Sequence, residues 1–168
     1  MPLVSIENLP DDSRTWVFGA DKTLTATQAR ALLAEVDRYL AQWRAHGAPL
    51  TVGRDFTDGR FLIVAVDQTT EGASGCSIDG LFRALKALGS QLGASLVTSG
   101  LVFYRDKEGS VNSVDRAQFS ALAAGGEISS ATRVFDPTVT TLGEWRARFE
   151  MSAADSWHAG LMHTTLHT

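Results

Sequence analysis

Residues 58–67 read Asp-Gly-Arg-Phe-Leu-Ile-Val-Ala-Val-Asp, and they decide the fold predicted for this chain. Asp58-Gly59 is a two-residue turn signal of the kind that joins antiparallel strands. Residues 50–57, before the turn, alternate apolar and polar side chains and predict a strand with one buried face. The run after the turn is apolar at every position, which indicates a strand covered on both faces.

Further helices and strands flank this hairpin in the sequence. Thr25-Ala26-Thr27-Gln28 has the pattern of a capping box that opens a helix, and a glycine marks the expected end of each helix. The elements predicted are a strand over residues 14–20, a helix over 25–47, a helix over 77–93 and a strand over 96–104. Their order predicts an α+β fold with a ferredoxin-like βαββαβ core over residues 14–104, its antiparallel sheet having the first and third strands at the centre.

Residues 105–158 contain shorter elements that are too small for a core of their own. We predict a C-terminal α/β subdomain that packs on the sheet. Its elements are a strand near Val111, a helix from Ser113 to residue 124, a strand over 132–135 and a helix capped by Thr141 and Glu144. Residues 159–168 are predicted to form a loose tail, and residues 1–168 as a whole a single domain.

The predicted sheet has one face without an obvious cover. Both helices of a βαββαβ core lie on the same side, so the apolar side chains on the other face of the central strands need a second layer. The C-terminal subdomain or a second copy of the chain would provide it. The sequence favours a homodimer.

Composition excludes several classes of protein. The 168 residues carry a formal net charge of −4, whereas a general nucleic-acid binder has a basic field. The first residues have no basic segment followed by an apolar one, and no apolar run approaches the roughly 18 residues of a spanning helix. A single cysteine fits a reducing compartment. We therefore expect a cytoplasmic protein that binds neither membranes nor nucleic acid.

Common cofactor-binding and catalytic motifs are missing. The sequence contains no phosphate-binding loop ending in Gly-Lys-Ser/Thr, no Gly-x-Gly-x-x-Gly, no His-Glu-x-x-His and no Gly-x-Ser-x-Gly. We predict no cofactor.

A glycine-rich segment, residues 72–79, reads Gly-Ala-Ser-Gly-Cys-Ser-Ile-Asp at a predicted helix start. Backbone N–H groups there attract anions, and the glycines allow a close approach by phosphate or carboxylate. The ligand-binding residues predicted are Gly72, Ser74, Gly75, Ser77 and Asp79. The same residues also suit an ordinary turn and helix cap, which is the commoner role for such a segment.

Cys76, within the same segment, supports an alternative function. A helix N-terminus favours thiolate, and a nucleophilic cysteine needs a base such as histidine. His158 is the predicted base and Asp155 the predicted residue that orients it. The competing interpretation is a structural cysteine together with a surface turn in which Trp157 anchors the chain end.

A metal site is not predicted. His158, His163 and His167 lie near the end of the chain, and the last two are four residues apart, but the residues between them form no ligand motif. Acidic residues near 67–79 are commonplace at strand ends and helix starts.

Four short motifs together resemble a family of small uncharacterised bacterial proteins, some of which carry the label ABC transporter ATPase. The motifs are Gln42-Trp43-Arg44-Ala45-His46-Gly47, Gly75-Cys76-Ser77-Ile78-Asp79, Val139-Thr140-Thr141 and Asp155-Ser156-Trp157-His158. The resemblance covers residues 16–158 and implies no established reaction. The ATPase label lacks support here, because the sequence has no phosphate-binding lysine motif.

Three functions follow from these observations. The leading prediction is a small cytoplasmic protein that binds a small anionic ligand or a protein partner through residues 72–79. The first alternative is a cysteine-dependent enzyme with Cys76 as nucleophile and His158 as base. The second is a structural or scaffolding homodimer.

Overall fold

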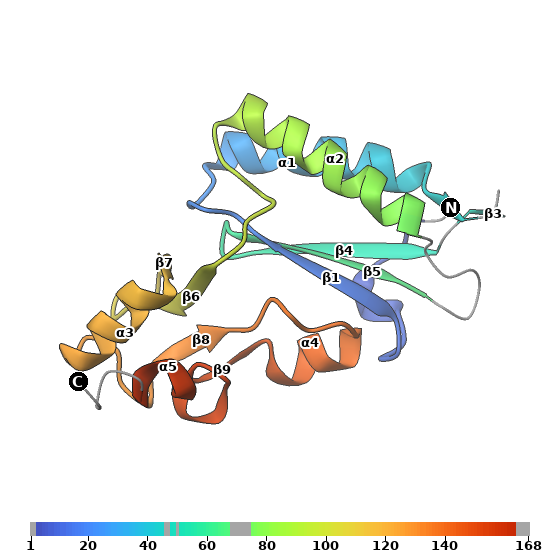
Figure 1. The fold of residues 1–168 in the computed structure, drawn as a ribbon. Helices are drawn as coiled ribbons and strands as arrows, with labels where there is room; N and C mark the ends of the chain where they lie inside the picture. Colours follow the sequence, from blue (N-terminus) through green and yellow to red (C-terminus); the bar gives the residue numbers. More distant parts are fainter. Residues whose placement is uncertain (1–2, 46–47, 50, 68–74, 164–168) are drawn as a thin grey trace. The chain divides into compact units, whose positions relative to one another are not determined.

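Helices and antiparallel sheets share the chain in the computed structural model, which describes residues 3–45, 48, 49, 51–67 and 75–163 (Figure 1). This arrangement confirms the predicted α+β class. The chain divides into two compact units: unit 1 consists of Met1–Thr98 and Pro137–Ala147, and unit 2 of Ser99–Asp136 and Arg148–Thr168. That the whole chain is a single domain stays a prediction.

Unit 1 is built on a three-stranded antiparallel sheet of order β1-β5-β4. Its elements are η1 (Ile6–Asn8), β1 (Arg14–Gly19), α1 (Ala26–Ala41), β2 (Arg44–Ala45), β3 (Ala48–Pro49), β4 (Val52–Thr57), β5 (Phe61–Val66), α2 (Gly75–Leu92) and α4 (Leu142–Arg148). β2 and β3 form a separate two-stranded sheet. The apolar strand predicted to be internal is β5, and it lies at the centre.

The predicted hairpin joins β4 to β5. Asp58 and Gly59 have φ angles of 57° and 65°, the left-handed values that a two-residue turn of this kind requires at both positions. The Arg60 amide donates to the Thr57 carbonyl across this turn, and the ladder begins with Thr57 paired with Phe61, so Arg60 is an extra residue between the turn and β5. A one-residue slip would move every core side chain to the opposite face.

Helix α1 begins where the sequence predicts. The Thr25 hydroxyl accepts a hydrogen bond from the Gln28 amide, and the Gln28 side chain accepts one from the Thr25 amide, which completes a capping box. The helix ends at Ala41, not at residue 47 as predicted. Trp43 packs in the core although it lies beyond the helix. Its helical spacing from the other apolar residues therefore predicted a helix that is too long.

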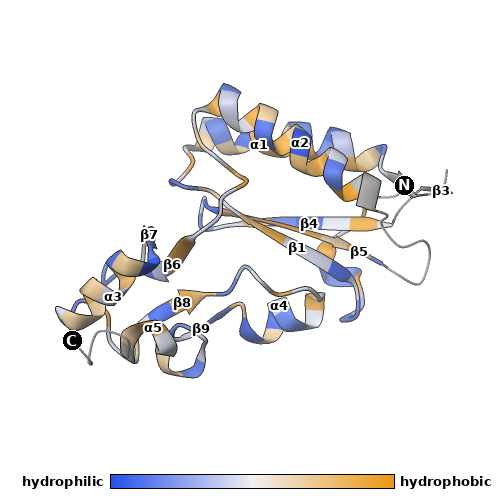
Figure 2. Ribbon diagram, viewed as in Figure 1, coloured by the Kyte–Doolittle hydropathy of each residue, from blue (hydrophilic) through white to orange (hydrophobic). Residues whose placement is uncertain are grey.

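Helices α1 and α2 cover one face of the sheet and run antiparallel (Figure 1). The Gln28 side chain, near the start of α1, donates to the carbonyl of Leu92 at the end of α2. Between helices and sheet lies a core that includes Leu32, Leu40, Leu81 and Leu85. Hydrophobic and hydrophilic residues alternate along both helices, as expected of amphipathic elements (Figure 2).

The other face of β5 is also buried within the single chain. Phe61, Ile63 and Ala65 are all 0% exposed. Gly53 of β4 packs directly beneath η1, since a Cβ there would lie 2.9 Å from the Cα of Ile6. In the described structure this face of β5 is therefore covered, and the homodimer stays a prediction.

The fourth strand of the predicted ferredoxin-like sheet does not join unit 1. Three strands take the expected order, but the strand predicted over residues 96–104 is β6 (Leu101–Arg105), which belongs to another sheet. Gly100, with φ of 75°, separates Leu96 in the core of unit 1 from Val102 in the core of unit 2. The outer edge of β1 instead pairs with the C-terminal segment, because Thr15 donates to the Thr140 carbonyl.

Unit 2 has a four-stranded antiparallel sheet of order β7-β6-β8-β9. Its elements besides β6 are β7 (Val111–Asp115), α3 (Arg116–Ala124), β8 (Arg133–Phe135), β9 (Glu150–Ser152), η2 (Ala153–Asp155) and α5 (Ala159–His163). Asp115 caps α3, not the predicted Ser113, and forms a capping box with Gln118. Residues 159–163, predicted as the start of a loose tail, are helical, and Ser120 donates to the Leu161 carbonyl.

Arg146 of α4 fastens the N-terminal segment to the C-terminal part of unit 1. Its guanidinium donates to the carbonyls of Ile6, Glu7 and Leu9 and to the Asp11 carboxylate. Arginine can bind several carbonyls at once because its planar guanidinium carries five N–H donors, whereas the lysine ammonium is a compact point charge.

We expect Arg146→Ala to lower the free energy of unfolding by about 1–3 kcal/mol, because the carbonyls at the end of η1 lose their donor. Urea denaturation followed by circular dichroism measures the change. Arg30→Ala is the control, since Arg30 is exposed and, within the described residues, its side chain donates a weak hydrogen bond to the Thr27 hydroxyl. Equal stability of the two variants would contradict the proposed role of Arg146.

Candidate functional site

The predicted anion-binding segment lies largely outside the described residues. Gly72 and Ser74 fall within residues 68–74, and for Gly75, Cys76 and Ser77 only the backbone, the first turn of α2, is described. Asp79 is exposed on α2. Ligand binding by residues 72–79 and reactivity of Cys76 therefore stay predictions.

His158, the predicted base, is a buried residue of unit 2. Its side chain is 0% exposed and stacks on the Trp157 ring at 3.8 Å between centroids, with Phe119 at 5.7 Å. Nδ1 shares a 2.8 Å hydrogen bond with the Ser156 hydroxyl, while Nε2 has no partner among the described residues. The imidazole is thus enclosed in the described structure, and its role as a base stays a prediction.

Asp155 does not orient His158 in the described structure. Its carboxylate accepts a hydrogen bond from Ser152, and Ser156 contacts the imidazole instead. Cys76 belongs to unit 1 and His158 to unit 2. The pairing of these two residues stays a prediction.

The imidazole of His158 is neutral at physiological pH. Burial lowers its pKa from 6.5 to about 4, an effect that the negative charge of Asp136 opposes and the positive charge of Arg116 reinforces. Charging an imidazole without solvent costs free energy, so burial favours the neutral form. His158 therefore links the stability of unit 2 to pH.

Within the described ranges, no three histidine, cysteine or acidic side chains lie close enough together to hold a metal ion. The side chains of His163 and His167, which are four residues apart, lie outside the described part of the chain. No helix in the described part is long and apolar enough to cross a bilayer.

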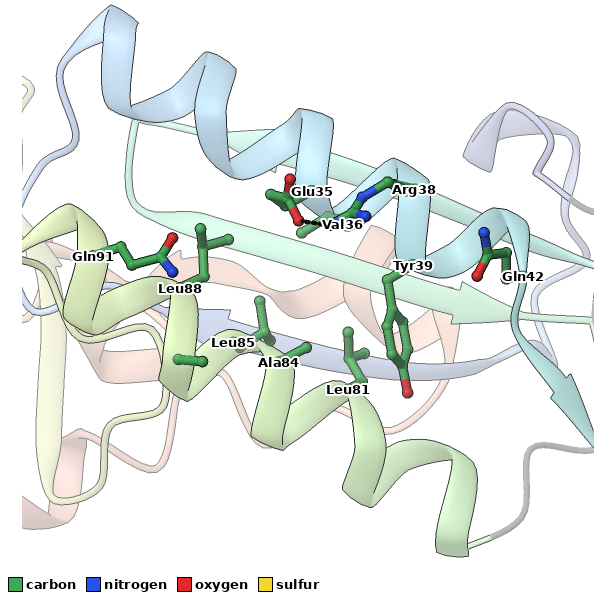
Figure 3. A pocket seen from close by; sticks show the side chains of 11 residues that line it. Glu35, Val36, Arg38, Tyr39, Gln42, Leu81, Ala84, Leu85, Leu88 and Gln91 are labelled. Atoms are coloured by element: carbon green, nitrogen blue, oxygen red, sulfur yellow. Dashed lines mark hydrogen bonds and ion pairs between the residues drawn. The ribbon is translucent and has the colours of Figure 1, made fainter.

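A groove of about 340 Å³ lies between α1 and α2 in unit 1 (Figure 3). Its floor is apolar and its rim is polar. The floor consists of Val36, Leu81, Ala84, Leu85, Ala87 and Leu88, and the rim of Glu35, Arg38, Tyr39, Gln42 and Gln91. We refer to it as the helix groove.

Tyr39 forms the wall at one end of the helix groove. Its ring extends from α1 toward the first half of α2, beside Leu81 (Figure 3). The hydroxyl lies so close to Gly80 that a Cβ on Gly80 would overlap it. Burial raises the pKa of the Tyr39 phenol, so it remains protonated at neutral pH. Gly80 thus allows the close contact that fixes this wall.

A larger, more polar hollow of about 590 Å³ lies in unit 2, between the β6–β7 turn and the residues before β8. Two of its cations already have a partner, because Arg105 and Arg133 both contact the Glu150 carboxylate. Asp106 accepts hydrogen bonds from the Glu108 and Ser110 amides within its own turn. These charges therefore stabilise the turn and sheet, and the helix groove is the better candidate site.

Sequence reasoning missed the helix groove because it depends on how two distant helices pack together. One signal was present: Gly80, Ala84 and Ala87 are small residues at helical spacing, beside the leucine stripe of α2. Small side chains next to large ones lower the surface of a helix and leave a groove beside its neighbour.

No family model, curated protein or solved structure matches this chain. The resemblance to the uncharacterised bacterial family accordingly stays a prediction.

The pH dependence of stability tests the environment of His158. Between pH 6.5 and 4 the unfolded chain binds a proton at this residue and the folded chain does not, so the free energy of unfolding falls as the pH drops through this window. With about 1.4 kcal/mol per pKa unit, the total contribution is on the order of 3 kcal/mol. Urea unfolding from pH 4 to 7 measures it.

His158→Asn provides the matched comparison, because asparagine can keep a hydrogen bond to Ser156 but does not titrate. We expect a shallower pH slope for this variant than for the wild type. The same slope in both proteins would show that another group causes the acid sensitivity.

Gly80→Ala tests the contact with Tyr39. Alanine is the better helix former by about 1 kcal/mol, yet the added methyl must displace the Tyr39 hydroxyl, so we expect a net loss of stability. In a Tyr39→Phe background the hydroxyl is gone, and the same change should then stabilise the protein. Thermal unfolding of the wild type, Gly80→Ala, Tyr39→Phe and the double variant shows whether the effect of Gly80→Ala on stability changes sign.

Gly160→Ala, where an added Cβ meets nothing within 4 Å, is the control for a helical glycine in open space. A destabilising effect of Gly80→Ala that persists without the Tyr39 hydroxyl would refute the steric explanation.

Proposed function

We propose that this chain binds a small amphipathic molecule in the helix groove. The observation that carries the proposal is the combination of an apolar floor with a polar rim in a concave site of about 340 Å³. Small-molecule sites are concave and mostly apolar, with a few polar groups that orient the ligand, and this volume lies at the small end of their range.

The floor of the helix groove is held in place by the core of unit 1. Val36, Leu81 and Leu85 are at most 2% exposed and pack in the core beneath the helices as well as lining the groove. A floor fixed by core packing supports a preformed site, because a ligand then orders few additional side chains when it binds.

The rim supplies polar groups on both sides. Arg38 and Glu35 form an ion pair on α1, and the amides of Gln42 and Gln91 lie toward opposite ends of the groove (Figure 3). A ligand with an apolar body and a polar end would meet suitable chemistry along its whole length.

This proposal retains the predicted class, a ligand-binding protein, and places the site on described residues. Helix α2 starts at Gly75, so the Tyr39 end of the groove belongs to the same half of the helix as the predicted anion-binding segment. No contact of a described residue favours cysteine-dependent catalysis over binding.

Titration with 1-octanol, a neutral amphipathic probe, tests the proposal. We expect amide chemical-shift changes in the nuclear magnetic resonance spectrum to cluster on residues 36–42 of α1 and 81–91 of α2. Ala84→Phe should remove them by filling the groove.

Ala34→Phe is the control, because Ala34 is exposed on α1 and does not line the groove. Circular dichroism establishes that both variants are folded. Shifts scattered over the chain, or an equal loss in both variants, would contradict binding in the helix groove.

A further inference from the structure

Arg83 of α2 lies beside Tyr39 at one end of the helix groove, although it does not itself line the groove. A Cβ at Gly80 would lie 3.8 Å from its terminal guanidinium nitrogen and would overlap the Tyr39 hydroxyl, so both groups flank the same glycine. The positive charge of Arg83 also acts on the Tyr39 phenol and favours its ionised form. The guanidinium therefore extends along α2 toward this end of the groove.

Arg83 differs from Arg38 and Arg54 in that no described carboxylate pairs with it, a property that it shares with Arg30 of α1. Arg38 pairs with Glu35, and Arg54 forms two hydrogen bonds with Asp37. Among the residues that the structure describes, Arg83 forms no ion pair. A cation without a carboxylate at the end of an apolar groove is complementary to an anionic ligand group.

The acidic residue of α2, Asp79, lies one turn before Arg83, and in the described part of the chain the two form no ion pair. The Tyr39 phenol, the wall at this end, is protonated at neutral pH and adds no negative charge. Gln42, the next rim residue of α1, is neutral, and the single carboxylate on the rim, Glu35, is already paired with Arg38. The Tyr39 end of the groove thus lies beside a cation that pairs with no described carboxylate, and the other end has the neutral Gln91.

We infer that the ligand of the helix groove is a small amphipathic carboxylate, whose apolar chain lies on the leucine floor of α2 and whose carboxylate pairs with Arg83. This inference rests on the function proposed above and narrows it to one ligand class. The ligand lies along the groove, with its charged group at the Tyr39 end.

Octanoate and 1-octanol separate the two proposals, because they share an eight-carbon chain and differ in charge. Affinity is measured by nuclear magnetic resonance titration of the wild type, Arg83→Gln and the control Arg30→Gln, an exposed arginine of α1 that does not line the groove. In Arg83→Gln we expect the Kd of octanoate to rise about threefold to fivefold, as for an ion pair at an exposed site, and that of 1-octanol to stay the same. Arg30→Gln should leave both unchanged.

The octanoate affinity of the wild type should also fall as salt is added, since Arg83 is exposed and its charge is screened. Equal binding of both probes to the wild type and to Arg83→Gln would overturn the carboxylate inference and leave groove binding intact. Binding of neither probe would overturn the proposed function itself.

Discussion

The burial of β5 on both faces is the constraint on which unit 1 depends. Each of its six side chains is 0% exposed. Burying a large aliphatic or aromatic side chain contributes about 1.5–3 kcal/mol, so a strand of this composition needs a layer on each side of the sheet. Helices α1 and α2 form one layer and fix the side chains that become the floor of the helix groove. On the other side, η1 packs over Gly53, and the returning segment around Thr140 pairs with the edge of β1.

Local signals in the sequence predicted the parts of the fold that local interactions determine. The capping box of Thr25 and Gln28 and the turn at Asp58-Gly59 involve residues within a few positions of one another, and both form as the sequence indicates. The strand predicted over residues 96–104 was assigned to the wrong sheet, because apolar side chains indicate that a segment is buried but not in which of two cores. Leu96 and Val102 are both buried, yet the turn at Gly100 assigns them to different units.

In the candidate site, too, local sequence patterns predicted less than the packing of distant segments determines. His158 was singled out because an acid, a hydroxyl and an imidazole are close in sequence, but the residue that contacts the imidazole is Ser156, and two aromatic rings enclose it. The helix groove depends on the antiparallel packing of two helices that lie more than thirty residues apart, which no single segment encodes. By helix propensity alone, Gly80 is an unfavourable residue in α2. The contact with Tyr39 explains its presence, because a larger side chain would overlap the Tyr39 hydroxyl.

The path of the chain between the two units affects how the protein can be made and divided. Residues 137–147 return to unit 1 after the sheet of unit 2 has begun, and residues from 148 onward complete unit 2. A ribosome must therefore release the chain past Thr140 before the edge of β1 acquires its partner there. No single cut in the chain separates the units, so a gene fragment that ends at residue 98 would lack both this pairing and the arginine that holds η1. Because each unit consists of two separate segments of the chain, neither can be produced complete from one continuous fragment.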